Sequence, residues 1–590
     1  MSDAGAGGPS GGMADGTDAA VTAGHLQQSV EERLSAWEGD RVAERLWAKD
    51  GSLWQASGKA PHDLAAWMGW LDLPVAMTER IGELTHLRDD ILRDGYRRSA
   101  VLGMGGSSLA PELFSRVFGA SAEHGTELRI LDSTHPDAVR GFREWARSAR
   151  TLFCVSSKSG STTEPNAFHA AMAEVAPALD FLAITDPGTA LADLARSQEF
   201  RAILESPPDV GGRYSALTVF GLVPAALHGV DLAGLLERAT AMADACRRPA
   251  TRNPGLRLGA LIGEAARSGR DKLTILTSPR LAAFGDWAEQ LIAESTGKAG
   301  TGIVPVVGEA PAAPEVYAAD RCFVFLALAA EADPALARLA LDLRRDGHPA
   351  EEILLADPFD VGAEFVRWEI ATAAAGIVLG IDPFDQPNVQ ESKDATKALL
   401  AAYAEQGALP SSAPVVAEAG LSAYADVAVL GDSPVTVDGA VRQLLDLVTD
   451  GDYFALLAYL PKEPEVEERL QRLRLRIREA LGVATTLGFG PRFLHSTGQL
   501  HKGGPPSGVF LQITADPRKD LPIPGWDETF GTLIAAQALG DLQSLQRRGR
   551  RVLRLHLGDA ESGLERVERM ITDALGTATG AHGAAVSAGA

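Results

Sequence analysis

Short apolar runs alternate with longer segments of helical periodicity through much of the chain. From about residue 96, each apolar run ends in a polar turn and is followed by apolar residues at helical spacing. The runs that we expect to be strands read SAVLGM, ELRILDS, TLFCVSS and DFLAITD, and then KLTILTS, RCFVFLAL and EILLAD. Such alternation predicts an α/β fold with two doubly wound parallel sheets in series.

The pattern differs on both sides of this region. A helical segment is expected before it, because Leu26, Val30 and Leu34 are spaced as on one helix face. Residues 405–435 are rich in Gly, Ala, Ser and Pro, and two more strand candidates, GVFLQITAD and RVLRLHLGD, follow. The predicted divisions are a disordered tail at 1–24, a helical segment at 25–95, α/β domains at 96–240 and 250–404, a linker at 405–435, an extra C-terminal α/β region at 436–575 and a disordered tail at 576–590.

Charge and composition narrow the class of partner. The 590-residue chain has a formal net charge of −23, which disfavours nucleic acid or an anionic membrane as a partner. A small anion is still compatible, since backbone N–H groups can bind it locally. No apolar run is long enough to span a bilayer, the N-terminus lacks a secretory pattern and the three cysteines form no CxxC pair. We therefore expect a cytoplasmic protein without a disulfide framework or zinc site.

Two glycine–hydroxyl loops are candidate anion sites. GMGGSSLAP (103–111) and SSKSGSTTE (156–164) each follow an expected strand and precede an expected helix. Such loops present backbone N–H groups, hydroxyl donors and a helix start to a phosphate. Helix capping explains the first loop equally well, and neither loop fits the GxGxxG or GxxxxGK[ST] pattern. GGRYS (211–215) could present Arg213 from a sharp turn, although a surface salt bridge is the simpler interpretation of this segment alone.

Taken together, the motifs resemble the phosphoglucose isomerase family, which is built from two sugar-isomerase (SIS) domains. The motifs that carry the resemblance are GMGGSSLAP, SSKSGSTTE, GGRYS, WAEQLIAESTGKAGTGIVPV and IDPFDQPNVQESK, in the family's order across residues 100–393. The chain most resembles the isomerase portion of transaldolase–isomerase fusions, and residues 436–575 resemble the extra C-terminal region of that portion. No transaldolase segment is present. The resemblance implies reversible conversion of glucose 6-phosphate to fructose 6-phosphate through a cis-enediol, without metal or cofactor.

The resemblance also implies residue roles. Glu294 matches the general base, and Gln290, four residues earlier on the same helix face, matches a sugar contact. Arg213 matches the enediol-stabilising arginine and Lys393 the lysine that assists ring opening. The expected phosphate site consists of Gly106, Ser107, Ser157, Lys158, Ser159 and Thr162, with Gly106 and Lys158 contributing backbone N–H groups.

The ring-opening histidine departs from the family pattern. Compact relatives carry it a few tens of residues after the base, but residues 299–320 contain no histidine. The segment FLHSTGQLHKGGP (493–505) resembles the histidine segment of bacterial enzymes, so we expect the C-terminal region to fold back and supply His495. His501 is the competing candidate, and a purely structural role for His495 is the alternative.

Other functions stay open at this point. A dual phosphoglucose/phosphomannose isomerase would differ only in pocket contacts. A non-catalytic SIS sugar-phosphate sensor would need the phosphate loops but not Glu294, Arg213 and Lys393 together, so their presence favours an enzyme. The chain could act as a monomer or as a homodimer, and association with a transaldolase is also open.

Overall fold

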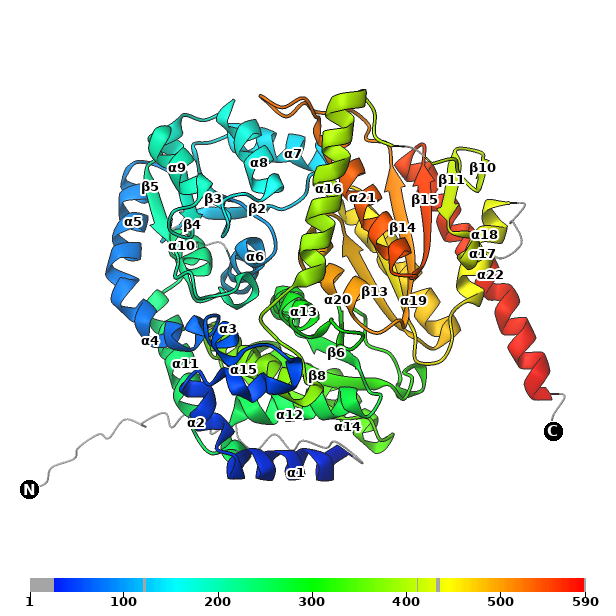
Figure 1. Cartoon of the computed structure of the whole chain (residues 1–590), viewed down its shortest axis with the longest axis horizontal. Helices are drawn as coiled ribbons and strands as arrows, with labels where there is room; N and C mark the ends of the chain where they lie inside the picture. Colours follow the sequence, from blue (N-terminus) through cyan, green and yellow to red (C-terminus); the bar gives the residue numbers. More distant parts are fainter. Residues whose placement is uncertain (1–25, 120–123, 411, 431–435, 588–590) are drawn as a thin grey trace, which may run out of the picture.

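The computed structural model describes residues 26–119, 124–410, 412–430 and 436–587, with side chains up to residue 576 apart from those of 427 and 428. Its ordered elements form two parallel sheets, one mixed sheet and their covering helices (Figure 1). The tail predicted at 1–24 lies outside the described residues. The last helix, α22 (Ala560–Ser587), extends into the segment 576–590, where we expected no regular structure; residues 588–590 lie outside the description.

The first sheet has the strand order β2-β1-β3-β4-β5 and is parallel throughout. Its strands are β1 (Arg98–Leu102), β2 (Glu127–Leu131), β3 (Thr151–Ser156), β4 (Phe181–Thr185) and β5 (Ala202–Glu205), and its helices are α6 (Gly106–Phe118), α7 (Pro136–Arg147), α8 (Thr163–Ala173), α9 (Ala190–Ser197) and α10 (Val219–His228). The strand order reverses between β1 and β3, and ligands bind at such a switch point, beyond the carboxyl ends of the strands. Both glycine–hydroxyl loops leave from these two strands, so the fold brings them side by side.

The second sheet repeats this arrangement with the order β7-β6-β8-β9. Its strands are β6 (Lys272–Thr277), β7 (Val304–Val307), β8 (Arg321–Leu328) and β9 (Ala350–Leu355). The helices of this part are α11 (Leu232–Ala245), α12 (Pro254–Arg267), α13 (Ala282–Thr296), α14 (Pro334–Arg345), α15 (Val361–Leu379) and α16 (Pro387–Gln406). The predicted fold class, with two doubly wound sheets and an additional α/β region, is therefore confirmed.

The C-terminal region forms a third sheet that uses the same strand order. Its parallel core is β13-β12-β14-β15, and two antiparallel strands continue from β15 to the edge. The strands are β10 (Val416–Glu418), β11 (Leu421–Ala425), β12 (Tyr453–Tyr459), β13 (Ala484–Phe489), β14 (Gly508–Ala515) and β15 (Arg551–Leu557), with helices α17 (Val427–Leu430), α18 (Val437–Asp446), α19 (Pro464–Leu481), α20 (Gly498–Gly503) and α21 (Phe530–Arg547). The two edge strands lie within the predicted linker, which is thus partly built into this sheet.

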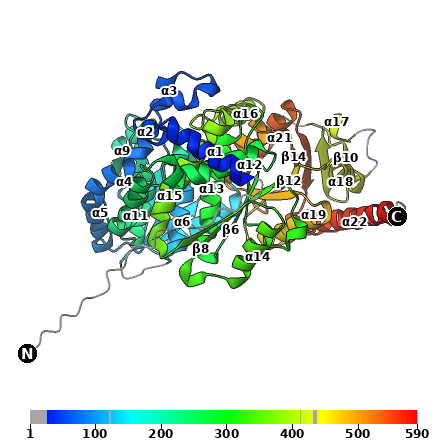
Figure 2. The same cartoon turned by 90° about the horizontal axis from the view of Figure 1, so that it is seen from below.

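The helices before the first sheet pack on helices of the first two sheet domains, with contacts to α10, α11 and α12. These helices are α1 (Leu26–Gly39), α2 (Val42–Trp47), α3 (Pro61–Ala65), α4 (Leu73–Ala76) and α5 (Ile81–Arg93), and α1 lies beside α12 in both views (Figures 1 and 2). Arg33 on α1 forms an ion pair with buried Glu264 on α12 at 2.7 Å.

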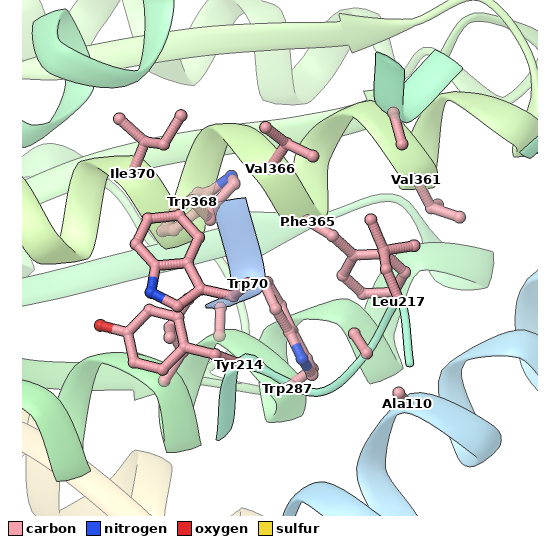
Figure 3. Close-up of a cluster of buried hydrophobic side chains, with 14 of the residues drawn as sticks. Trp70, Ala110, Tyr214, Leu217, Trp287, Val361, Phe365, Val366, Trp368 and Ile370 are labelled. Carbon is pink, nitrogen blue, oxygen red and sulfur yellow. The ribbon is translucent and has the colours of Figure 1, made fainter. Parts of the chain in front are cut away.

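An aromatic core joins the first two sheet domains. Trp70 stacks on Tyr214, while Trp287 of α13 meets Phe365 of α15 edge-on (Figure 3). The ring centroids are 5.1 Å apart in the first pair and 4.7 Å in the second. Tyr214 follows Arg213, and Trp287 lies on α13, the helix that carries Glu294. This core therefore fixes the two segments that carry Arg213 and Glu294.

Candidate active site

The first glycine–hydroxyl loop meets the GGRYS turn at close range. Gly105 has a φ of 58°, and a Cβ on Gly106 would lie 1.9 Å from the carbonyl oxygen of Gly212. Both positions therefore require glycine, the first for its backbone conformation and the second for the close approach. The close approach places the start of α6 beside the turn that carries Arg213.

The predicted phosphate donors cluster in the loop after β3 and at the start of α6. The Ser157 hydroxyl donates to Thr162 Oγ1 at 3.0 Å, and the Ser159 and Ser161 hydroxyl oxygens are 3.1 Å apart. Ser107 is buried in the first turn of α6. The Lys158 ammonium pairs with Asp186 and lies over the Trp67 ring. The backbone N–H group of this lysine is therefore the part that we expect to bind phosphate. A phosphate role for this set stays a prediction.

Glu294 lies in the last turn of α13 and is only 6% exposed. Burial raises the pKa of its carboxyl group above the usual range, and the positive charges of Arg213, His495 and Lys393 only partly oppose this effect. The nearest cation is Arg213, whose Nη1 lies 3.7 Å from Glu294 Oε2. The result is a buried carboxylate of increased basicity, as a proton acceptor requires.

Arg213 is held by four hydrogen bonds. It donates to Ser295 Oγ at 2.7 Å and to Gln386 Oε1 at 2.7 Å. It also donates to two backbone carbonyl oxygens, those of Pro383 at 2.6 Å and Asp385 at 3.0 Å. Only 2% of the residue is exposed, which excludes the surface salt bridge that the isolated motif suggested. Its guanidinium is a fixed buried cation, preorganised to stabilise a developing negative charge.

The C-terminal region brings His495 to Glu164, a residue of the first sheet domain. His495 Nε2 lies 3.1 Å from Glu164 Oε1, and Gln537 donates to the same oxygen at 2.7 Å. Thr134 donates to Gln537 Oε1 at 2.7 Å, while Gln290 donates to the His495 carbonyl oxygen at 2.7 Å. These contacts fix both the ring and the backbone of the histidine.

Glu164 is a site residue that we did not single out from the sequence, although it is the last letter of SSKSGSTTE. Burial acts to raise the pKa of its carboxyl group, but the charge and hydrogen bond of His495 outweigh burial and the pKa falls below its usual range. Gln537 and Thr134 were also missed, and no sequence motif marks either of them.

His501 and Lys393 have different surroundings. His501 packs among the rings of Tyr453, Phe493 and Phe510, both of its ring nitrogens lack a hydrogen-bond partner, and burial lowers its pKa well below the usual range. It is a core residue, whereas His495 contacts Glu164; the ring-opening role of His495 stays a prediction. Lys393 is half-buried on α16, close enough to Glu164 and Glu294 for its charge to lower the pKa of both carboxyl groups.

The described part of the chain contains no group of three or more His, Cys, Asp or Glu side chains that could hold a metal ion. Within the same residues, no helix combines the length and the apolar character needed to cross a membrane.

Comparisons with known proteins bear on this geometry. No family model matches the sequence. A glucose-6-phosphate isomerase of Synechococcus sp. (strain JA-3-3Ab) is 36% identical over 213 residues, 33% of this chain and 39% of the relative. The glucose-6-phosphate isomerase of Carboxydothermus hydrogenoformans is 27% identical over 432 residues, 63% of this chain and 91% of the relative. The chain thus spans only 39% of the length of the cyanobacterial relative.

Two solved structures share the fold. A hypothetical protein from Thermus thermophilus superposes with a TM-score of 0.54 and 24% identity, covering 64% of this chain and 99% of that one. A glucose-6-phosphate isomerase from Chlamydia trachomatis superposes with a TM-score of 0.51 and 16% identity, covering 64% of this chain and 87% of that one. The paired switch-point loops and the two doubly wound sheets define the class of α/β fold that these two structures share. Within that class the chain is similar to curated glucose-6-phosphate isomerases, at 27% and 36% identity over the matched segments.

Proposed function

We propose that the protein is a glucose-6-phosphate isomerase, which interconverts glucose 6-phosphate and fructose 6-phosphate in the cytoplasm. The observation that carries this proposal is the convergence of Glu294, Arg213 and the His495–Glu164 pair, with Lys393 within electrostatic range. A phosphate-binding protein without catalysis has no use for a buried carboxylate beside a fixed guanidinium. The family resemblance supports the choice of substrate.

The first step is ring opening. In its protonated form His495, held against Glu164, donates a proton to the ring oxygen while solvent takes the proton of the C1 hydroxyl, and the C1–O5 bond breaks. Lys393 assists, since the positive charge of its ammonium group acts on both Glu164 and Glu294. The substrate's phosphate is held meanwhile by the hydroxyl and backbone donors of the two loops.

The second step moves one proton between neighbouring carbons. The Glu294 carboxylate removes the C2 proton, the electron pair forms a C1–C2 double bond, and the carbonyl oxygen acquires the negative charge of the enediol. Arg213 stabilises that charge from its fixed position. The hydroxyl proton on O2 then passes to O1 and Glu294 returns its proton to C1, which gives the C2 ketone, so no net proton or electron is consumed.

The test is turnover of fructose 6-phosphate, coupled to glucose 6-phosphate dehydrogenase, in the presence of excess chelator. Robust activity that is insensitive to the chelator supports the proposal. A parallel assay with mannose 6-phosphate separates a dual-specificity isomerase from a glucose-specific one. Absence of turnover, with fructose 6-phosphate still raising the melting temperature, would overturn the enzyme proposal in favour of a sugar-phosphate sensor.

A further inference from the structure

A cavity of about 910 Å³ lies between the first sheet, α13 and the C-terminal region. Its walls are the edge strand β2, α6, α13 and the segments that follow β12 and β13. Glu289 and Ser496 line it, each next in sequence to a residue of the candidate active site, but Glu294 and Arg213 do not. The proposed isomerase mechanism leaves this cavity unused.

One end of the cavity has more carboxyl groups than cations. Arg492 forms ion pairs with Glu112, Asp132 and Asp286 at 2.5, 3.1 and 3.4 Å. A fourth carboxyl group, that of Glu289, accepts a hydrogen bond from Ser496 at 3.1 Å. Of the other cations in the wall, Lys462 pairs with Glu467 at 3.6 Å and Arg474 donates to the backbone carbonyl oxygens of Val307 and Thr485. Exposed Arg116 lies 4.0 Å from Glu112, and Arg129 pairs with Glu127.

Burial disfavours the ionised form of three of these carboxyl groups. Burial, followed by the charge of Asp286, raises the pKa of Glu289 to about 8, and the positive charges of Arg492 and Arg474 do not offset this. Burial also raises the pKa of Asp132 and Asp286 despite the adjacent Arg492. An added positive charge in the cavity would stabilise the ionised form of all three.

A second acceptor lies toward the other end of β2. His228 is 3% exposed, and its Nδ1 lies 3.0 Å from the Thr126 carbonyl oxygen, so we assign the ring hydrogen to Nδ1. Its Nε2 is then a buried acceptor without a partner in the cavity wall. Thr126 and Asp132 are six residues apart along the strand, about 20 Å, and the apolar side chains of Leu109 and Phe142 also line the cavity.

We propose that this cavity binds a linear polyamine, with one ammonium group among Glu112, Asp132, Asp286 and Glu289 and another N–H group directed to His228 Nε2. Ammonium groups supply the charge and donors that these acceptors lack, and the intervening methylenes suit the apolar wall. A single metal ion fits less well: the cavity is too large for it, and no group of three ligating side chains is arranged around one in the described residues. The site is independent of the proposed isomerase function.

The test is calorimetric titration of the intact protein with spermine at pH 7.0 and pH 8.5. Because the chain has a net charge of −23, about 0.1 M salt is needed to screen nonspecific attraction. We expect one site per chain, with about eight-fold tighter binding at pH 8.5, because ionisation of a carboxyl group with a pKa of about 8 increases by that factor. Putrescine, which is too short to span the cavity, should bind at least ten-fold more weakly.

Two isosteric variants separate this site from the acidic surface. Glu289→Gln resembles the protonated carboxyl group; it should weaken spermine binding about ten-fold at pH 8.5 and remove the pH dependence. Glu405→Gln makes the same charge change at an exposed position on α16 and should leave binding unchanged. If Glu289→Gln does not fold, Asp286→Asn replaces it, with the same expected weakening. Failure of spermine to bind, or equal binding by both Glu→Gln variants, would overturn the polyamine site without affecting the isomerase proposal.

Discussion

At the residue scale, the chemistry depends on the ionisation of Glu294. Glu294→Gln keeps the shape and removes the proton acceptor, so kcat should fall about 10³-fold while the affinity for fructose 6-phosphate changes little. The coupled assay and calorimetry measure the two quantities. Glu405→Gln is the matched control and should retain full activity. Turnover of the Glu294 variant within ten-fold of the original would show that another group is the base.

The same substitution should stabilise the fold at alkaline pH. The pKa of Glu294 is higher in the folded chain than in the unfolded chain, so its contribution to stability is fully present below the unfolded pKa and is lost as pH rises through the folded pKa. At pH 8, Glu294→Gln should therefore melt about 1–3 °C above the unsubstituted protein. Near pH 4 the difference should vanish. A lower melting temperature at pH 8 would mean that the Arg213 pair outweighs burial.

The two histidines of 493–505 should respond in opposite ways to substitution. His501→Phe replaces two buried nitrogens that lack partners with carbon, so stability should be equal or higher, by about 1 kcal/mol, with activity within two-fold. His495→Gln should slow turnover of cyclic glucose 6-phosphate about 10²-fold. An open-chain analogue should lose less. Equal losses on the cyclic and open-chain substrates would count against a ring-opening role for His495.

At the element scale, buried Glu309 joins the second sheet to the third. It pairs with Arg321 of β8 at 3.1 Å and accepts a hydrogen bond from Thr485 of β13 at 3.0 Å. Burial acts to raise its pKa, but Arg321 and Arg474 outweigh burial and lower it. The stabilisation is therefore present above the unfolded pKa and is lost as pH falls through the folded pKa.

Glu309→Gln should lower the free energy of unfolding by about 3 kcal/mol, because it leaves the buried Arg321 charge without a counter-ion. Activity should fall as well, since His495 reaches the site from the region that this contact anchors. Denaturant titration measures the first effect. Asp342→Asn, which breaks an exposed ion pair with Arg338, should leave stability unchanged and serves as the control. If Glu309→Gln leaves the free energy of unfolding unchanged, apolar packing alone attaches the third sheet to the second.

Most elements with strong apolar runs could be predicted from the sequence, although β12, YFALLAY, was not predicted as a strand despite its complete burial. RCFVFLAL coincides with β8 because the whole run is buried. β7 was missed since VPVV is short and contains Pro305, which an edge strand tolerates. β13, ATTLGF, was missed because threonine and glycine interrupt its apolar pattern. Strand order in the third sheet depends on pairing between distant segments, which periodicity does not encode.

At the scale of the whole molecule, the candidate site combines residues that local motifs cannot bring together. Glu164 and His495 are 331 positions apart, and their contact requires the C-terminal region to dock on the first sheet. The resemblance to the family suggested that His495 reaches the site, but not its carboxylate partner. The cavity on β2 had no sequence signal at all, because its charged residues come from separate segments of the chain.

This arrangement predicts that one chain suffices for catalysis. Glu294, Glu164 and His495 come from the second, first and third sheet domains of a single chain, so no group from another copy is needed to complete the site. Mixing Glu294→Gln protein with His495→Gln protein should therefore restore no activity, even after joint unfolding and refolding. Specific activity should also stay constant on dilution from micromolar to nanomolar concentration. Recovery of about a quarter of the unsubstituted activity in the mixture would instead establish a site shared between two subunits, with His495 exchanged across their interface.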